Sequence, residues 1–208
     1  MQKTTTQIVR MVELALLIAL VVVLQLVGTF IKIGPLPMSL VLVPIVIGGF
    51  LRGPKAGAVL GLAFGIVTAI MGITGADAFS ALLWGNNPIA FVIICLLKAT
   101  AAGLGAALIY KGLLALTKGK YATAMTVVAS ACAPIINTGI FVLGMFVCYF
   151  DTMNSLPSMF PDAFGGFSGA IQVVLLGLAG VNFLGELAVN LILSPAIVRI
   201  VSVIGKRL

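Results

Sequence analysis

The sequence has few charged residues and no histidine. Of its 208 residues, 8% are charged and 62% are hydrophobic, whereas a soluble domain carries about 25% charged residues. A soluble protein of this composition would lack the polar groups needed to cover its surface. The composition therefore predicts an integral membrane protein, and the length suits a single membrane domain over residues 1–208.

Several catalytic and metal-binding patterns are also missing. No GxxxxGK[ST] loop is present, so the chain is not expected to hydrolyse ATP by that route. Cys95, Cys132 and Cys148 lie in apolar runs without CxxC spacing, which favours apolar packing over a metal site or a redox pair. The sequence has no GxSxG or HExxH motif either. We expect no enzymatic activity, no cofactor and no metal.

The net charge of +7 comes from basic residues at the ends of apolar segments, not from a basic face. That distribution argues against nucleic-acid binding and is typical of membrane orientation. Ten of the twelve basic residues fall on one side of the expected membrane segments: Lys3, Arg10, Arg52, Lys55, Lys111, Lys118, Lys120, Arg199, Lys206 and Arg207. The positive-inside rule therefore predicts that both termini are cytoplasmic.

Apolar runs predict an all-α integral membrane protein, a bundle of six transmembrane helices. The expected segments are residues 8–30, 38–51, 55–73, 88–110, 121–149 and 169–203. A helix needs about 20 residues to cross the hydrocarbon core. The second segment is shorter and carries Pro44 near its middle, so we expect it to be kinked, tilted or only partly spanning.

The third segment carries glycines at positions 53, 57, 61 and 65, a strict four-residue spacing. Small residues at this spacing let a second helix approach closely. The stripe is consistent with a sliding interface or with tight static packing, and we favour static packing.

Polar side chains inside the apolar runs are the strongest functional candidates, because each is costly to place in a bilayer. Lys98 and Glu186 lie near the middle of their segments, and we expect them to form an ion pair. Asn182 stands four residues before Glu186 and shares its helix face. Asn137 lies mid-segment beside Pro134, which should free backbone groups for bonding. These side chains either bind a polar solute or fix the helix register.

The expected outward loops hold a second group of candidate binding residues: Trp84, Asn86, Asn87, Tyr149 and Asn154. Aromatic rings and amides at the mouth of a helix bundle suit a flat, polar small molecule. The alternatives are an aromatic belt at the membrane interface for the rings and a helix N-cap for the asparagines before position 88.

The layout resembles the substrate-binding S component of an energy-coupling factor (ECF) vitamin transporter. The resemblance rests on ELALLIAL in the first segment, in which Ala15 and Ala19 match the AxxxA motif of that family. It also rests on the stretches VLVPIVIGGFLRGPKAGAVLGLAFG, NNPIAFVIICLLKATAAGLGAALIY, APIINTGIFVLGM and NFLGELAVNLILSPAI. It implies a protein of the bacterial plasma membrane that binds a water-soluble vitamin under a loop at 31–37. It further implies that Ala15 and Ala19 dock on a transmembrane coupling subunit, which works with two cytoplasmic ATPases.

The resemblance leaves the vitamin open. Lys98 would suit a carboxylate, so pantothenate is the first candidate, followed by riboflavin or folate. A stand-alone secondary transporter of a small polar solute and a non-transporting structural subunit are the alternative functions.

Overall fold

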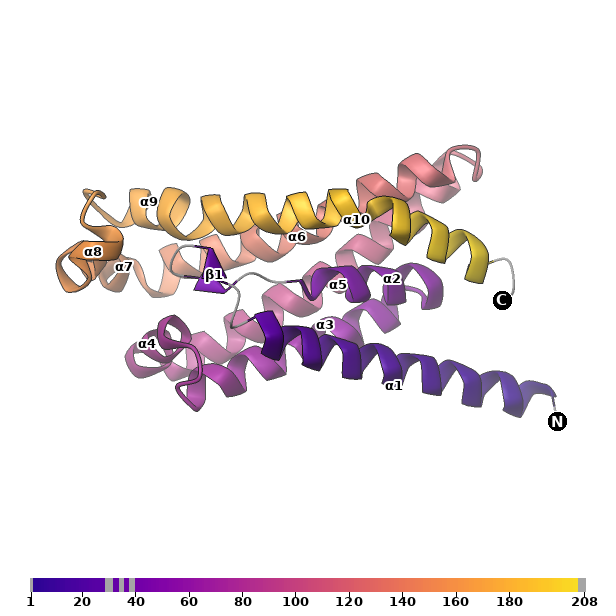
Figure 1. The fold of residues 1–208 in the computed structure, drawn as a ribbon, viewed down its shortest axis with the longest axis horizontal. Helices are drawn as coiled ribbons and strands as arrows, with labels where there is room; N and C mark the ends of the chain where they lie inside the picture. Colours follow the sequence, from indigo (N-terminus) through magenta and orange to yellow (C-terminus); the bar gives the residue numbers. More distant parts are fainter. Residues whose placement is uncertain (1, 29–31, 34–35, 38–39, 206–208) are drawn as a thin grey trace.

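The computed structural model describes residues 2–28, 32–33, 36–37 and 40–205. The described residues are mainly helical, and they include one short antiparallel hairpin, in which β1 (Lys32–Ile33) pairs with β2 (Leu36–Pro37). The predicted capping loop at 31–37 coincides with this hairpin, although residues 31, 34 and 35 lie outside the described residues. The hairpin follows α1 (Gln2–Gly28), and β1 lies beside α10 (Val181–Gly205) (Figure 1).

Five helical stretches are long and apolar enough to cross a membrane. They are residues Gln7–Gly28 within α1, α3 (Pro54–Ile73), α5 (Pro88–Leu116), α6 (Ala122–Cys148) and the continuous run Ala170–Ile204. That run comprises α9 (Ala170–Gln172), a π-helical stretch η1 (Val173–Gly180) and α10. All five correspond to predicted segments. The start of α1 and the end of α10 lie at the same end of the bundle (Figure 1).

The sixth predicted segment is the short helix α2 (Leu42–Arg52). Its 11 residues rise about 16 Å, about half of the hydrocarbon thickness. Pro44 lies in the first turn of this helix, where a missing N–H breaks no internal hydrogen bond. Of the three alternatives for this segment (kinked, tilted or only partly spanning), the short helix agrees with a segment that spans only partly, and Pro44 does not mark a kink. The helix is short because it ends at Gly53, whose φ of 89° only glycine adopts readily.

The segments predicted as outward loops contain short helices that the hydropathy pattern did not indicate. They are α4 (Ala78–Asn86), α7 (Phe150–Met159) and α8 (Pro161–Phe164). All three lie at the end of the bundle opposite the start of α1 (Figure 1). Their side chains help to close that end, since Leu83, Met153, Leu156 and Phe164 join one buried apolar cluster with Phe91 and Met145.

The glycine stripe of α3 packs directly against the backbone of α5. A methyl group at Gly57 would overlap the carbonyl oxygen of Gly103, and one at Gly61 would overlap that of Ala99. At Gly65 a Cβ would lie 2.7 Å from the carbonyl oxygen of Cys95. Backbone contact at three successive turns leaves no room for side chains between the helices, which favours static packing over a sliding interface.

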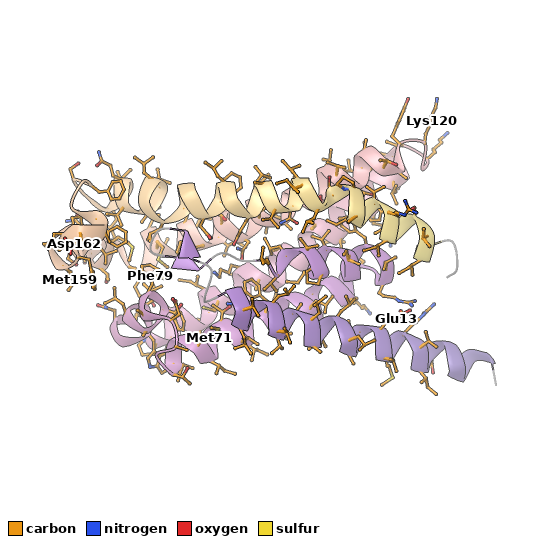
Figure 2. All side chains as sticks on the ribbon, viewed as in Figure 1. Glu13, Met71, Phe79, Lys120, Met159 and Asp162 are labelled. Atoms are coloured by element: carbon orange, nitrogen blue, oxygen red, sulfur yellow. The ribbon has the colours of Figure 1, made fainter. Side chains whose placement is uncertain are left out.

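The outer surface of the long helices is strongly apolar, and side chains project from it on all the helices drawn in Figure 2. Val147 is 80% exposed, Ile192 75% and Leu16 65%. Exposed apolar side chains on every long helix would be an aggregation hazard in water but are suited to contact with lipid.

Candidate functional site

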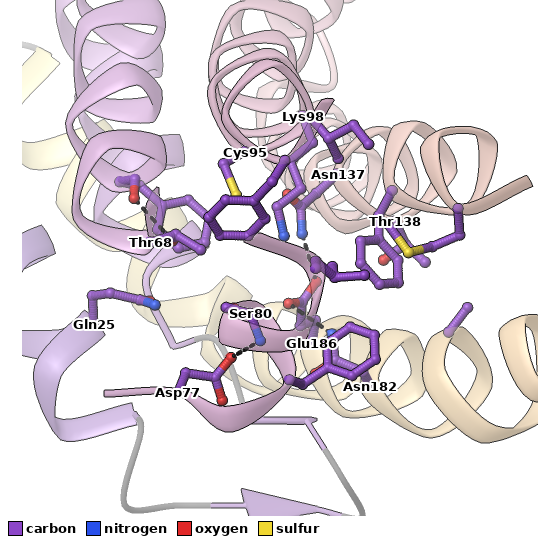
Figure 3. A pocket seen from close by; sticks show the side chains of 18 of the residues that line it. Gln25, Thr68, Asp77, Ser80, Cys95, Lys98, Asn137, Thr138, Asn182 and Glu186 are labelled. Atoms are coloured by element: carbon purple, nitrogen blue, oxygen red, sulfur yellow. Dashed lines mark hydrogen bonds between the residues drawn. The ribbon is translucent and has the colours of Figure 1, made fainter. Parts of the chain in front are cut away.

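A pocket lies inside the bundle, where the end of α1, α3, α4, α5, α6 and the η1–α10 run meet. It offers about 80 Å³ to the centres of water-sized molecules, and one water needs about 10–15 Å³ on this measure. The polar residues that line it are Gln25, Thr68, Asp77, Ser80, Lys98, Asn137, Thr138, Asn182 and Glu186. Figure 3 shows these side chains converging from different helices on a common space.

Glu186 is the polar centre of the pocket. It is 1% exposed, and each carboxylate oxygen accepts one amide hydrogen bond. Asn137 Nδ2 donates to Oε2 at 3.3 Å, and Asn182 Nδ2 donates to Oε1 at 3.3 Å (Figure 3). Asn190 Nδ2 donates to the backbone oxygen of Glu186 at 2.9 Å. Two amides, one on α6 and one on α10, therefore hold the carboxylate, and the third bonds the backbone of the same residue.

Lys98 enters the same pocket from α5 but makes no contact ion pair with Glu186. In the described part of the chain, the salt bridge found is Arg52–Glu13. The Lys98 ammonium lies 5.2 Å from the centre of the Phe141 ring and interacts with the Glu186 carboxylate through space. The prediction of a direct pair is corrected to this extent: the hydrogen-bond donors to the Glu186 carboxylate are the amides of Asn137 and Asn182.

Two buried polar atoms of the pocket wall have no hydrogen-bond partner among the described residues. They are the Asn137 amide oxygen and the Thr138 hydroxyl, which follow one another on α6. Asn137 is 3% exposed and Thr138 is 9% exposed. Because an unmade hydrogen bond in a buried place costs about 1–3 kcal/mol, these groups point to a molecule that completes them.

Asp77 and Gln25 line the pocket, and the sequence analysis did not single out either residue. Asp77 is 6% exposed, and its Oδ2 accepts the Ser80 backbone N–H at 2.9 Å, which makes it the N-cap of α4. Gln25 is 7% exposed, and its Nε2 lies 3.8 Å from the Met71 sulfur. Like Asn137, Gln25 is a polar residue inside an apolar run, so the sequence could have indicated it. Asp77 lies in a turn between helices, where a polar residue is ordinary, so the sequence did not indicate it.

Phenylalanine rings form the apolar part of the pocket wall. Phe79 and Phe141 face each other with ring centres 6.5 Å apart and planes inclined by 57°. Phe64 and Phe91 complete the set of rings. Rings beside amides and carboxylates suit a small molecule with an apolar body and polar ends.

The loop residues predicted to bind a solute lie outside this pocket. Asn87 accepts the Ala90 N–H at 3.2 Å and caps α5, as its alternative interpretation proposed. Asn86 is exposed and donates to the Leu82 oxygen at 2.9 Å. Asn154 accepts the Ala170 N–H at 3.3 Å. Each amide is engaged in a hydrogen bond to the backbone of a helix at this end of the bundle.

The two aromatic residues of that group pack inside the protein. Trp84 meets the edge of the Phe91 ring at 6.3 Å between centres. Tyr149 is 2% exposed, and its hydroxyl donates to the backbone oxygen of Asn87 at 2.6 Å. Burial raises the pKa of Tyr149 to about 12, so the hydroxyl keeps its proton and the bond between the ends of α4 and α6.

Ala15 and Ala19 lie on the exposed face of α1. Leu14, Leu17, Ile18 and Val21, on the other face of this helix, pack against α2 and α3. The alanines therefore face away from the bundle, with Leu16 and Leu20 beside them. A face of small residues flanked by leucines can receive another helix at short distance.

Known proteins resemble this chain both in sequence and in fold. The family described as "ECF transporter, substrate-specific component" matches residues 9–198. ThiT from Listeria monocytogenes has a similar structure, with a TM-score of 0.63 and 18% sequence identity, over 92% of this chain and 94% of that one. At that identity the likeness concerns the fold. No curated protein matches the sequence significantly.

Proposed function

The chain belongs to the family of ECF transporter substrate-specific components, and we propose that it binds its vitamin in the pocket around Glu186. Members of this family are substrate-binding subunits of a vitamin transporter and are not enzymes, since ATP hydrolysis belongs to partner subunits. The chain is accordingly a multi-pass membrane protein that serves vitamin uptake.

The pair of unpartnered groups at Asn137 and Thr138 carries this proposal. Both are nearly buried and both line the pocket. A bound solute that donates to the Asn137 oxygen and bonds the Thr138 hydroxyl would satisfy both groups at once. Lys98, Asn182 and Glu186 lie within the same pocket and would hold the rest of the molecule.

Pantothenate is our first candidate for the vitamin. Lys98 is the one cation among the described residues that line the pocket, and it suits a carboxylate. Hydroxyl and amide hydrogens of pantothenate would serve the Asn137 oxygen and the Glu186 carboxylate. The limited volume favours pantothenate over riboflavin and folate, which are larger. The pocket wall also contains two acidic residues, Asp77 and Glu186, which would suit a cationic ligand. A cationic vitamin such as thiamine is therefore the alternative to the anionic pantothenate.

Membrane topology and docking complete the proposal. We propose a single membrane domain over 1–208 with six spans, counting α2, and with both termini in the cytoplasm of a bacterial plasma membrane. The common end of α1 and α10 supports an even number of spans. Ala15 and Ala19 would dock on the transmembrane coupling subunit, which acts with two cytoplasmic ATPases.

Titration calorimetry of the detergent-purified protein, without ATP, tests the ligand. We expect pantothenate to bind more tightly than riboflavin, folate or thiamine. Asn137→Ala should weaken binding by about tenfold or more, as expected for a lost hydrogen bond of about 1.5 kcal/mol. Asn154→Ala is the matched control, an exposed asparagine outside the pocket, and should leave the affinity unchanged. Equal losses in both variants would remove the pocket from the proposal.

Uptake into cells that contain the coupling subunit and the ATPases tests docking. Ala15→Trp should stop uptake, because a bulky indole on the exposed alanine face would keep another helix from approaching closely. Binding of the vitamin should stay intact in the same variant. Loss of binding would contradict a docking role, and uptake by liposomes driven by an ion gradient without partners would indicate a secondary transporter instead.

A further inference from the structure

A second hollow lies between α1, α2 and α3, at the end of the bundle where α1 begins. It offers about 420 Å³ to the centres of water-sized molecules. The residues that line it are Arg10, Met11, Leu14, Leu51, Arg52, Lys55, Ala56 and Val59. Glu13, which pairs with Arg52, marks its place in Figure 2. No residue of this basic groove lines the Glu186 pocket.

The basic groove has an excess of positive charge. Arg10, Arg52 and Lys55 line it, and Glu13 neutralises one of them through its ion pair with Arg52. Arg10 is also close enough to Arg52 for the two guanidinium groups to repel each other. An anion placed between them would relieve that repulsion.

Arg52 lines the basic groove and also has a buried donor without a partner in the described part of the chain. Its side chain is 10% exposed, and its Nη2 takes the Glu13 carboxylate. Its buried Nε–H has no hydrogen-bond partner within the described residues. A nearly buried guanidinium with a free N–H is well suited to a phosphate oxygen, because its donors form a rigid fork.

The rest of the basic groove is apolar and lies where the long helices begin. The membrane-spanning stretches of α1 and α3 start at Gln7 and Pro54. Met11 is 71% exposed and Val59 is 42% exposed, so apolar surface continues from the cations along the outside of the two helices. A hydrocarbon chain that follows this surface would keep its headgroup at the level of Arg10 and Lys55.

We propose that the basic groove is a binding site for an anionic phospholipid. The lipid phosphate accepts hydrogen bonds from the charged ends of Arg10 and Lys55, and the Arg52 guanidinium adds positive charge beside them. One acyl chain lies along Met11 and Val59. The continuous apolar surface favours a lipid over a free phosphate ion. The site is independent of the vitamin pocket and lies on the helix that carries Ala15 and Ala19.

Native mass spectrometry of protein exchanged into mixed phosphatidylglycerol and phosphatidylcholine tests the proposal. We expect the wild type to retain phosphatidylglycerol selectively. Arg10→Gln/Lys55→Gln should lower that retention by about thirtyfold, because each of the two basic residues near a membrane surface contributes about 1 kcal/mol. Lys118→Gln/Lys120→Gln makes the same charge change beside α6 at the same end of the bundle and should retain the lipid.

The outcomes separate this site from its alternatives. Equal loss of lipid in both double variants would show a general charge effect and overturn the site. Displacement of the lipid by soluble glycerol phosphate at equal concentration would show that the headgroup phosphate alone is recognised, which contradicts the lipid. Vitamin binding is measured on the same samples, and it should stay unchanged in Arg10→Gln/Lys55→Gln. A folded, vitamin-binding variant that retains the lipid fully would also overturn the proposal.

Discussion

Between α3 and α5 the two backbones are in direct contact, whereas the space between α5, α6 and α10 is left to polar side chains. At the seam, Gly57, Gly61 and Gly65 bring α3 against carbonyl groups of α5. In the pocket, Asn137 and Thr138 have buried polar atoms without partners among the residues that the structure describes. Helix α5 thus takes part in both regions. Its contact with α3 is closely packed, whereas the pocket beside it has polar groups that only a ligand would satisfy.

The two regions contribute to the stability of the fold in opposite directions. Close backbone packing maximises dispersion contacts and holds α5 in one position. The unpartnered groups of the pocket cost stability in the free protein, and binding recovers that cost. A rigid seam beside an unsatisfied pocket therefore favours a site that is already formed before its ligand arrives.

The largest effect should come from breaking the seam. Gly61→Leu places a side chain where the carbonyl oxygen of Ala99 lies, and neither backbone can move without disrupting its helix. We expect a loss of about 3 kcal/mol or more in the free energy of unfolding, at the upper end of overpacking costs. The measurement is thermal unfolding, with the monodisperse fraction in detergent followed by size-exclusion chromatography.

Gly139→Leu is the control for that change. Gly139 is exposed on α6, and an added Cβ there meets nothing within 4 Å. The stability of the Gly139→Leu variant should stay at the wild-type level or rise slightly, since glycine is a poor helix former. If Gly61→Leu were tolerated as well as Gly139→Leu, the seam would be a sliding interface after all.

The next effect concerns the charges in the pocket. Lys98→Met leaves the Glu186 carboxylate buried without its cation, and Glu186→Gln leaves the ammonium without its anion. Each single variant should destabilise the bundle, and the double variant should recover part of the loss, with a coupling energy of about 1–2 kcal/mol. Chemical unfolding of the four proteins gives the cycle, and strictly additive losses would refute the coupling.

Hydropathy predicted the long helices well, because each must present about 20 apolar residues to a bilayer. It also indicated four polar side chains that the structure places around one pocket. Lys98, Asn137, Asn182 and Glu186 interrupt apolar runs, and a polar group in such a run has few ways to be satisfied except by meeting others. The structure brings all four to one pocket.

The prediction was less successful at the end of the bundle where α4 and α7 lie. Trp84 and Asn154 carry the residue types of a binding site, but short helices occupy this region and use these side chains for their own caps and packing. Asp77 reaches the pocket only because α4 packs against α3 and α5. Local sequence does not determine how these short helices pack. It therefore predicted neither the capping and packing roles of Trp84 and Asn154 nor the position of Asp77 in the pocket wall.

The most direct test of the account compares two threonines on neighbouring helices. Thr138 on α6 and Thr100 on α5 both have a buried hydroxyl without a partner in the described structure, but only Thr138 lines the pocket. Each is replaced by valine, which keeps the shape and removes the hydroxyl, and both vitamin affinity and thermal stability are measured.

If the pocket is completed by its ligand, both variants should be as stable as the wild type or slightly more stable, because an unsatisfied group has been removed. Thr138→Val should then bind the vitamin about five- to tenfold more weakly, the equivalent of one hydrogen bond of about 1 kcal/mol, while Thr100→Val binds it normally. Unchanged affinity in Thr138→Val, or an equal loss in Thr100→Val, would contradict the account.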